Sequence, residues 1–227
     1  MDPNSISTIV QGTDWGLVST VVQIIASVTT CFVMVVTAGV AIYGITAWRR
    51  EFRGKRQIEL AEDVLALFYE AKDAISAIRS PFSYGGEGST RKPVEGEPDQ
   101  EKKVRDTAYI VWERYDKHQG VFNKLHSMRY RFMAQIGKEE AEPFEQMREI
   151  VNRILNAAGS LSGLWVERSR LPYKSEEKKE LSNEVRRLEA VFWWQGSKDE
   201  IDKEVAEIVS RIEKTCESVI LKARAKH

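Results

Sequence analysis

Residues 16–48 read GLVSTVVQIIASVTTCFVMVVTAGVAIYGITAW, a run of 33 positions without one Asp, Glu, Lys or Arg, and residues 49–56, RREFRGKR, follow directly. The hydrocarbon core of a bilayer contains no water to satisfy free backbone amides, so an apolar run of this length must cross it as a helix. Residues 24–45 alone would extend about 33 Å at ~1.5 Å per residue, close to the thickness of one bilayer core. The sequence therefore predicts one membrane-spanning helix at residues 17–47.

The charges on either side of this run predict its orientation. Residues 1–16 carry two Asp and no Lys or Arg, whereas the other flank carries five basic residues. The positive-inside rule places residues 1–16 outside as a short extracytoplasmic tail and everything after the span in the cytoplasm. A secretory signal peptide is the main alternative, but its charges should precede a shorter apolar segment.

Residues 48–57 form a basic juxtamembrane segment in this scheme. Its basic residues also have the charge to attract anionic lipid headgroups. They are Arg49, Arg50, Arg53, Lys55 and Arg56.

The composition of the whole chain is balanced. Lys plus Arg equals Asp plus Glu at 34 each, which gives a formal net charge of zero and does not favour nucleic acid as a partner. The only cysteines are Cys31, inside the predicted span, and Cys216, in the predicted cytoplasmic part. Both are expected to remain thiols in a reducing compartment.

Residues 58–225 are expected to be helical, because apolar residues recur at spacings of three and four. Pro81, Gly137, Pro172 and Gly196 divide this rhythm into several helices, each with one apolar seam. Such helices are expected to pack as an up-and-down bundle, so the predicted fold class is all-α. Residues 82–100 are rich in Gly and Pro and predict a flexible surface loop rather than a phosphate-binding loop, which would require a preceding strand and a Lys-Ser/Thr pair.

The residues that usually carry chemistry form no recognisable motif. The three histidines are His118, His126 and His227, and none has the spacing of a common metal site. We therefore predict no enzyme activity, no metal and no cofactor. His118 and Arg129 interrupt an apolar seam, where a polar residue typically fixes helix register or meets an acidic partner on a facing helix. The alternative for His118 is a proton or ligand sensor.

Two further features suggest contacts with other molecules. Trp193 and Trp194 lie next to the core position Phe192 and are candidates for a partner or membrane contact, unless they fold back onto the bundle. Small and polar residues also recur along one face of the predicted span. This face predicts self-association through close backbone packing and interhelical hydrogen bonds, the alternative being a single helix that tolerates small residues. Its members are Gly16, Thr20, Gln23, Ser27, Thr30, Thr37, Ala41 and Gly44.

Several segments, including Trp48-Arg49-Arg50, Arg129-Tyr130-Arg131-Phe132-Met133, Glu142-Pro143-Phe144 and Phe192-Trp193, resemble a group of uncharacterised bacterial single-span membrane proteins. The resemblance runs from about residue 48 to residue 220. It implies a bacterial inner membrane location, a single pass and a cytoplasmic helical domain, and it implies no particular activity. Relatives typically have a single Trp followed by Glu-Gly where this chain has Trp194-Gln195-Gly196, so the aromatic pair is not a feature of the whole group.

These observations predict a membrane-tethered, non-catalytic scaffold or sensor that acts through protein contacts. Its expected partners are membrane lipid, further copies of itself and an unknown protein. The alternative is an oligomeric membrane effector or channel component, of the general kind found in bacterial anti-phage defence.

Overall fold

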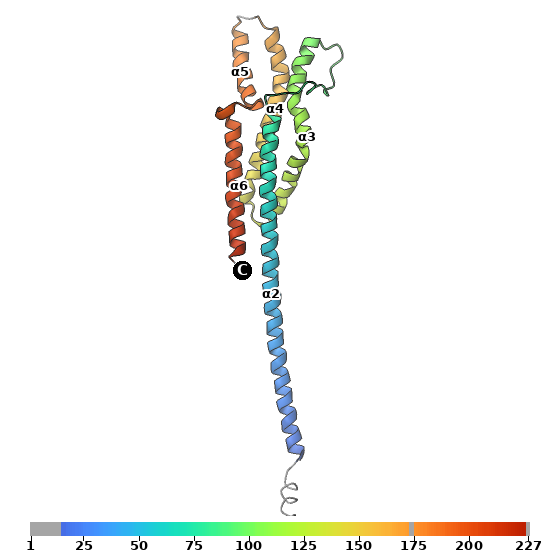
Figure 1. Ribbon diagram of the computed structural model, residues 1–227, viewed down its shortest axis with the longest axis vertical. Helices are drawn as coiled ribbons and strands as arrows, with labels where there is room; N and C mark the ends of the chain where they lie inside the picture. Colours follow the sequence, from blue (N-terminus) through green and yellow to red (C-terminus); the bar gives the residue numbers. More distant parts are fainter. Residues whose placement is uncertain (1–14, 173–174, 226–227) are drawn as a thin grey trace, which may run out of the picture. The chain divides into compact units, whose positions relative to one another are not determined.

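The structure is a computed structural model that describes residues 15–172 and 175–225 (Figure 1). Its helices are α2 (Trp15–Ile78), α3 (Asp99–Gln135), α4 (Glu142–Arg170), α5 (Glu176–Phe192) and α6 (Glu200–Arg224). Two single 3-10 turns, η1 (Glu139–Ala141) and η2 (Gly196–Lys198), lie between them. Helix accounts for 85% of the structure and no strand occurs among the described residues, which confirms the all-α class.

The chain divides into two compact units, Met1–Arg53 and Gly54–His227. In the first unit, the described part is helical from Trp15 onward, and residues 1–14 of the predicted tail lie outside the described residues. The second unit begins a few residues earlier than the predicted bundle. Gly54 is buried, and the Gln57 side-chain amide donates a hydrogen bond of 3.0 Å to the carbonyl oxygen of Gln135 at the end of α3. The second half of the basic segment is thus part of the bundle.

In the second unit, the helices alternate in direction (Figure 1). The C-terminal part of α2, then α3 and then α4 run up, down and up, and α5 and α6 follow each other down the remaining column. The break between α5 and α6 lies beside the end of α2, where the Trp194 amide donates a hydrogen bond of 2.9 Å to the Arg79 carbonyl oxygen. This arrangement agrees with the predicted up-and-down bundle.

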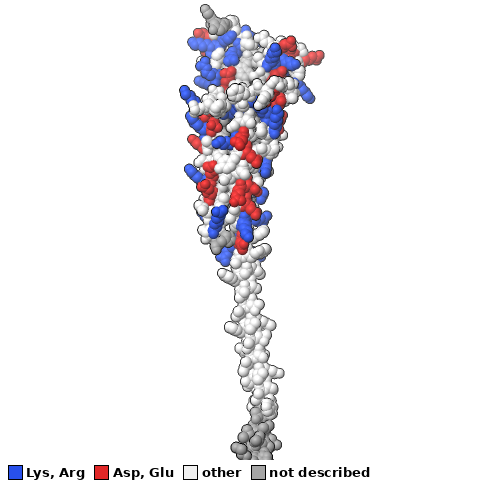
Figure 2. Space-filling view, viewed as in Figure 1, with Lys and Arg blue, Asp and Glu red and all other residues white. Residues whose placement is uncertain are grey.

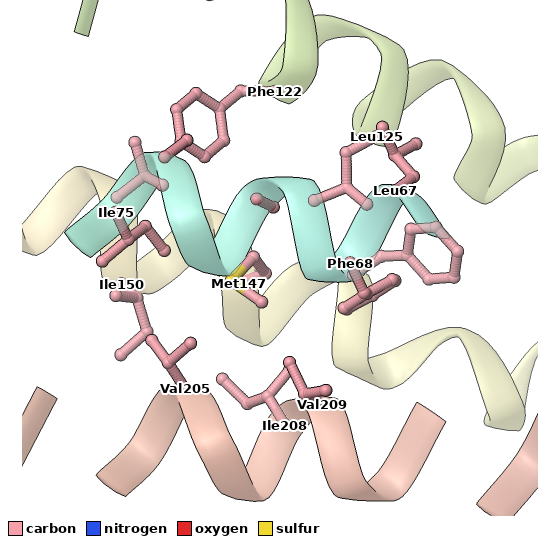
Figure 3. Close-up of a cluster of buried hydrophobic side chains, with 14 of the residues drawn as sticks. Leu67, Phe68, Ile75, Phe122, Leu125, Met147, Ile150, Val205, Ile208 and Val209 are labelled. Atoms are coloured by element: carbon pink, nitrogen blue, oxygen red, sulfur yellow. The ribbon is translucent and has the colours of Figure 1, made fainter. Parts of the chain in front are cut away.

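One hydrophobic core joins all five helices of this unit. Figure 3 shows a part of it with labelled side chains from α2, α3, α4 and α6. Phe68 of α2 packs edge-on against Phe144 of α4 with ring centroids 4.9 Å apart, and Phe132 of α3 lies 5.3 Å from the same ring. Each fully buried Leu, Ile or Phe contributes about 1.5–3 kcal/mol relative to exposure in water. The apolar seams read from the sequence form this core, since residues such as Leu60, Val64 and Ile212 are fully buried.

Local signals explain most helix ends. Pro81 follows the end of α2, and Pro172 follows the end of α4. Ser175 caps α5, because its hydroxyl accepts a hydrogen bond of 3.2 Å from the Lys178 amide. The breaks at Pro81 and Pro172 were predicted from the sequence.

The loop between α2 and α3 ends at Pro98, slightly before the predicted limit of residue 100. Its flexibility stays a prediction, but the structure adds anchors that composition does not indicate. Arg91 pairs with Glu97 at 2.5 Å and with Asp106 of α3 at 2.8 Å. The Gly88 amide donates a hydrogen bond of 2.7 Å to Glu113 of α3.

Candidate functional site

The apolar part of α2 exposes its large side chains. Between Trp15 and Trp48 these side chains are 44–71% exposed, and this surface carries no charge (Figure 2). Among the described residues, α2 is the one helix long and apolar enough to cross a membrane, judged by length and composition. Soluble proteins rarely expose apolar surface of this extent, so it requires either lipid or other protein to cover it.

The predicted self-association face lies exposed along this part of α2. Its threonine hydroxyls already have acceptors within the helix: Thr20, Thr30 and Thr37 each donate a hydrogen bond of 2.8 Å to the carbonyl oxygen four residues before. Gln23 differs, because its side-chain amide forms no hydrogen bond with any residue that the structure describes. A polar group left unsatisfied in hydrocarbon is costly, so Gln23 has the strongest reason to seek a partner. Whether the face associates stays a prediction.

The predicted lipid-facing cluster is also exposed on α2. All five side chains lie on the surface of a continuous helix rather than on a separate linker. They are Arg49, Arg50, Arg53, Lys55 and Arg56. Exposed cations of this density provide the charge needed to attract anionic lipid, which the sequence predicted for them.

A buried ion pair joins the end of α2 to the α5–α6 connection. Arg79 Nη1 and Nη2 lie 2.7 and 2.8 Å from Oδ1 and Oδ2 of Asp199, and the two side chains are 2% and 0% exposed. Arg79 Nε also donates to the carbonyl oxygen of Val191 at 2.8 Å, and Nη2 donates to those of Ala190 and Trp193 at 3.0 Å. The guanidinium therefore holds the carbonyl groups at the C-terminal end of α5.

Asp199 completes this junction from the other side. It is the N-cap of α6, and its Oδ1 accepts a hydrogen bond of 2.8 Å from the Asp202 amide while Oδ2 accepts one of 2.7 Å from the Gln195 amide. Burial by itself raises the pKa of Asp199, but the hydrogen bonds from Arg79 and the two amides outweigh it and leave the pKa below its usual value. The carboxylate is thus ionised and fully hydrogen-bonded at neutral pH.

A second buried arginine holds the residues that follow α2. Arg114 of α3 donates to the carbonyl oxygens of Ser80 at 2.6 Å and Phe82 at 2.7 Å, and it pairs with Glu87 at 2.6 Å. The hydrogen bond from Arg114 lowers the pKa of Glu87. Arg114 Nη1 also donates to the carbonyl oxygen of Ile78 at 3.4 Å, a carbonyl group that the end of α2 leaves without an intrahelical donor.

The structure corrects the predicted place of the aromatic pair. Gly196 was expected to end the helix that contains Phe192, but α5 ends at Phe192 itself, so both tryptophans follow the helix. Trp193 is half-buried and packs edge-on against Phe192 with ring centroids 4.3 Å apart, so its ring folds back onto the core. Trp194 is 48% exposed and is the member of the pair that offers surface to a partner. Its role in a contact stays a prediction.

A cleft of about 370 Å³ lies between α3 and α4. Arg129 lines it and pairs at 2.9 Å with Glu145 of α4, which confirms the expected acidic partner on a facing helix. His118 is half-buried on α3 and is not among the lining residues. The other polar side chains of the cleft are Asn123, His126, Arg148 and Asn152.

Metal ligands do not gather in the part of the chain that the structure describes. No group of three or more His, Cys, Asp or Glu side chains has the geometry to hold an ion there. His227 lies outside the described residues. The buried charges identified above serve instead to connect helices.

No family model, curated protein or solved structure matches the chain. The resemblance to single-span bacterial membrane proteins therefore stays a prediction.

The residues missed from the sequence are mainly charged ones. Arg79, Arg114 and Asp199 are all buried, although charged residues are usually exposed. One signal was present: Asp199 precedes the apolar rhythm of α6 at the position of an N-cap. Nothing local marks Arg79 as its partner.

Proposed function

We propose that this protein is a membrane-tethered, non-catalytic helical module that acts as a scaffold or sensor through protein contacts. In this proposal residues 17–47 cross a bacterial inner membrane once, the preceding residues are extracytoplasmic and the bundle is cytoplasmic. The observation that carries the proposal is the uncharged, exposed surface of α2 between Trp15 and Trp48, followed at once by the basic cluster. The buried charges of the bundle support a structural role, because their ion pairs connect the ends of different helices.

Membrane insertion and orientation are tested together. The full chain, expressed in a bacterium, is expected to stay in the membrane pellet after an alkaline carbonate wash, because an integral helix is not released by removing ionic contacts. A green fluorescent protein fused to the C-terminus is expected to fluoresce, and an alkaline phosphatase fusion is expected to be inactive, since the first folds in the cytoplasm and the second in the periplasm. Extraction by carbonate, or active phosphatase, would overturn the proposal.

The basic cluster supplies a control for the orientation. Changing Arg49, Arg50 and Arg53 to Gln is expected to produce a fraction of chains with active C-terminal phosphatase, because these charges lie directly beside the span. Changing Arg186 and Arg187, which are exposed on α5, is expected to leave orientation unchanged. Equal effects of the two sets would show that the cluster does not determine topology.

The scaffold role is tested at Trp194. The expected result of Trp194→Ala is the loss of one or more proteins that co-purify with the wild-type chain from its native membrane, measured by quantitative mass spectrometry. Tyr130→Ala is the matched control, because Tyr130 is an exposed aromatic residue on α3 that is 57% exposed. Identical co-purifying proteins for wild type and Trp194→Ala would remove Trp194 as a contact.

The second candidate function, an oligomeric membrane effector or channel component, is favoured by Gln23. We expect energy transfer between labelled copies of the full chain in liposomes, and we expect Gln23→Leu to weaken it. Thr30→Val is the control, because the Thr30 hydroxyl already bonds to the Ala26 carbonyl oxygen within the helix and should matter little. Energy transfer that is absent, or insensitive to Gln23→Leu, would argue against association through this face.

A further inference from the structure

The cleft between α3 and α4 has the size and the apolar floor of a small-molecule site. Its volume of about 370 Å³ falls within the range of ligand pockets in proteins, about 300–1,000 Å³. Phe122 and Leu125 of α3 and Phe144 and Val151 of α4 line it and are buried. These buried apolar side chains can pack against a flat apolar group of a few carbon atoms.

The polar part of the cleft is positively charged. Its lining includes Arg129 and Arg148 and contains no carboxylate. The nearest acid is Glu145, which lies 2.9 Å from Arg129 and 3.8 Å from Arg148, so two guanidinium groups share one carboxylate. One positive charge is therefore left without a counterion among these three side chains.

Two kinds of hydrogen-bond donor remain for a ligand. Arg129 Nε is buried and has no hydrogen-bond partner within the described residues. Buried polar groups are normally satisfied, so the Arg129 guanidinium beside the cleft is one hydrogen bond short of full satisfaction. The side-chain amides of Asn123 and Asn152 lie at the same cleft and can donate to an anion as well.

We propose that this cleft binds a small organic anion that carries a flat apolar group. The anionic group of the ligand lies between Arg129 and Arg148 and accepts hydrogen bonds from them. Its apolar group packs against the apolar floor of the cleft, which α3 and α4 form. The ligand would connect the two helices, so its binding favours their packed arrangement. This inference is independent of the membrane location of α2.

Phenyl phosphate is a suitable probe, because it combines a dianion with a flat ring. Its binding to the full chain in phosphatidylcholine nanodiscs is measured by calorimetry, with empty nanodiscs as a blank. Inorganic phosphate and phenol are titrated separately, since each supplies only one half of the proposed chemistry. Phenyl phosphate is expected to bind at least about tenfold more tightly than either, since the cleft contacts both parts.

Two variants and one control connect binding to the cleft. Arg129→Gln and Arg148→Gln are each expected to weaken phenyl phosphate binding about tenfold or more, because charge-assisted hydrogen bonds are lost. Arg148 is 53% exposed, so Arg148→Gln keeps the test valid even if Arg129→Gln impairs folding. Arg131→Gln removes the same charge from an exposed position on α3 away from the cleft lining, and it is expected to change nothing.

Four results would overturn the proposal: no saturable binding of phenyl phosphate, phosphate alone binding as tightly, equal weakening by Arg131→Gln, or no weakening by Arg148→Gln. A lipid headgroup offers similar chemistry and is distinguished by nanodiscs that contain phosphatidylglycerol. Unchanged phenyl phosphate binding in those nanodiscs supports a soluble ligand, whereas competition would assign the cleft to lipid and overturn that assignment.

Discussion

The ion pair between Arg79 and Asp199 permits a sharp prediction for Asp199→Asn. Each Asp199 carboxylate oxygen accepts two hydrogen bonds, one from Arg79 and one from a backbone amide, at 2.7–2.8 Å. Asn has one side-chain oxygen, so its NH₂ group must face two donors and leave them unsatisfied. The Arg79 charge also stays buried without its counterion. Removing one partner of a buried pair typically costs about 3–5 kcal/mol, and we expect a loss of this size in the free energy of unfolding.

Pulse proteolysis in urea, performed on the full chain in nanodiscs, measures this loss as a lower urea midpoint for the bundle. The matched control is Glu200→Gln, which removes the same charge from the next residue. Glu200 is 75% exposed and pairs with Lys203 on the surface, so the control should leave the midpoint nearly unchanged. A loss below about 1 kcal/mol for Asp199→Asn, the size of one ordinary hydrogen bond, would show that the ion pair does not stabilise the bundle as its burial indicates.

The pH dependence of this effect has a defined sign. Asp199 has a lower pKa in the folded state than its ordinary value of 3.8, so it stabilises the folded state at pH values above that value. The contribution is lost as pH falls below 3.8 toward the folded-state pKa, because the unfolded chain then binds a proton more readily. The difference in unfolding free energy between wild type and Asp199→Asn should therefore be constant near neutral pH and shrink in acid. A difference that grows in acid would contradict the assignment.

Three further predictions concern the bundle. Gly88→Ala should lower the free energy of unfolding by more than about 2 kcal/mol, because Gly88 has φ +83° and an added Cβ would lie 2.0 Å from a backbone oxygen of α3. Gly86→Ala is the comparison, because Gly86 has φ +93° but open space around it, so this change should cost only the backbone strain of about 1–2 kcal/mol. Arg114→Met should lower the free energy of unfolding, measured in urea, by about 3 kcal/mol, because the Ser80 carbonyl oxygen loses its hydrogen bond from Arg114 and the Glu87 carboxylate loses its cationic partner. Lys117→Met, at a side chain 58% exposed, should leave it nearly unchanged. Cys216, whose pKa is raised to about 11 by burial, should react with a maleimide about a hundredfold more slowly in the folded protein than in urea, which mass spectrometry in a Cys31→Ser background measures.

Periodic patterns predicted the helices and much of the core. Ile201, Val205 and Ile212 recur at helical spacing, and all three are buried in α6. Such predictions succeed because helix geometry places residues three and four apart on one face, whatever the rest of the chain does. The cap at Ser175 and the stop before Pro172 follow from similarly local rules.

The end of α5 shows where local rules fail. The sequence predicted that Gly196 would end this helix, yet it ends at Phe192. Arg79 accounts for the difference, because its guanidinium donates hydrogen bonds to the carbonyl oxygens of Ala190 and Val191. These donors replace the backbone amides that a continued helix would supply, which makes an earlier end favourable. Arg79 directly follows α2 and lies more than 100 positions away in the sequence, so no local pattern could reveal it.

The sequence by itself determined the uncharged run of residues 16–48, the helical class and the apolar seams, because each depends on composition or on spacing within one segment. Only the tertiary structure decided which charges are buried and paired, where the α2–α3 loop is anchored and how α3 and α4 form a cleft. These features require residues far apart in the chain to meet at hydrogen-bond distance. The physical reason is that an ion pair such as Arg79–Asp199 is favourable only when packing brings both groups together out of water.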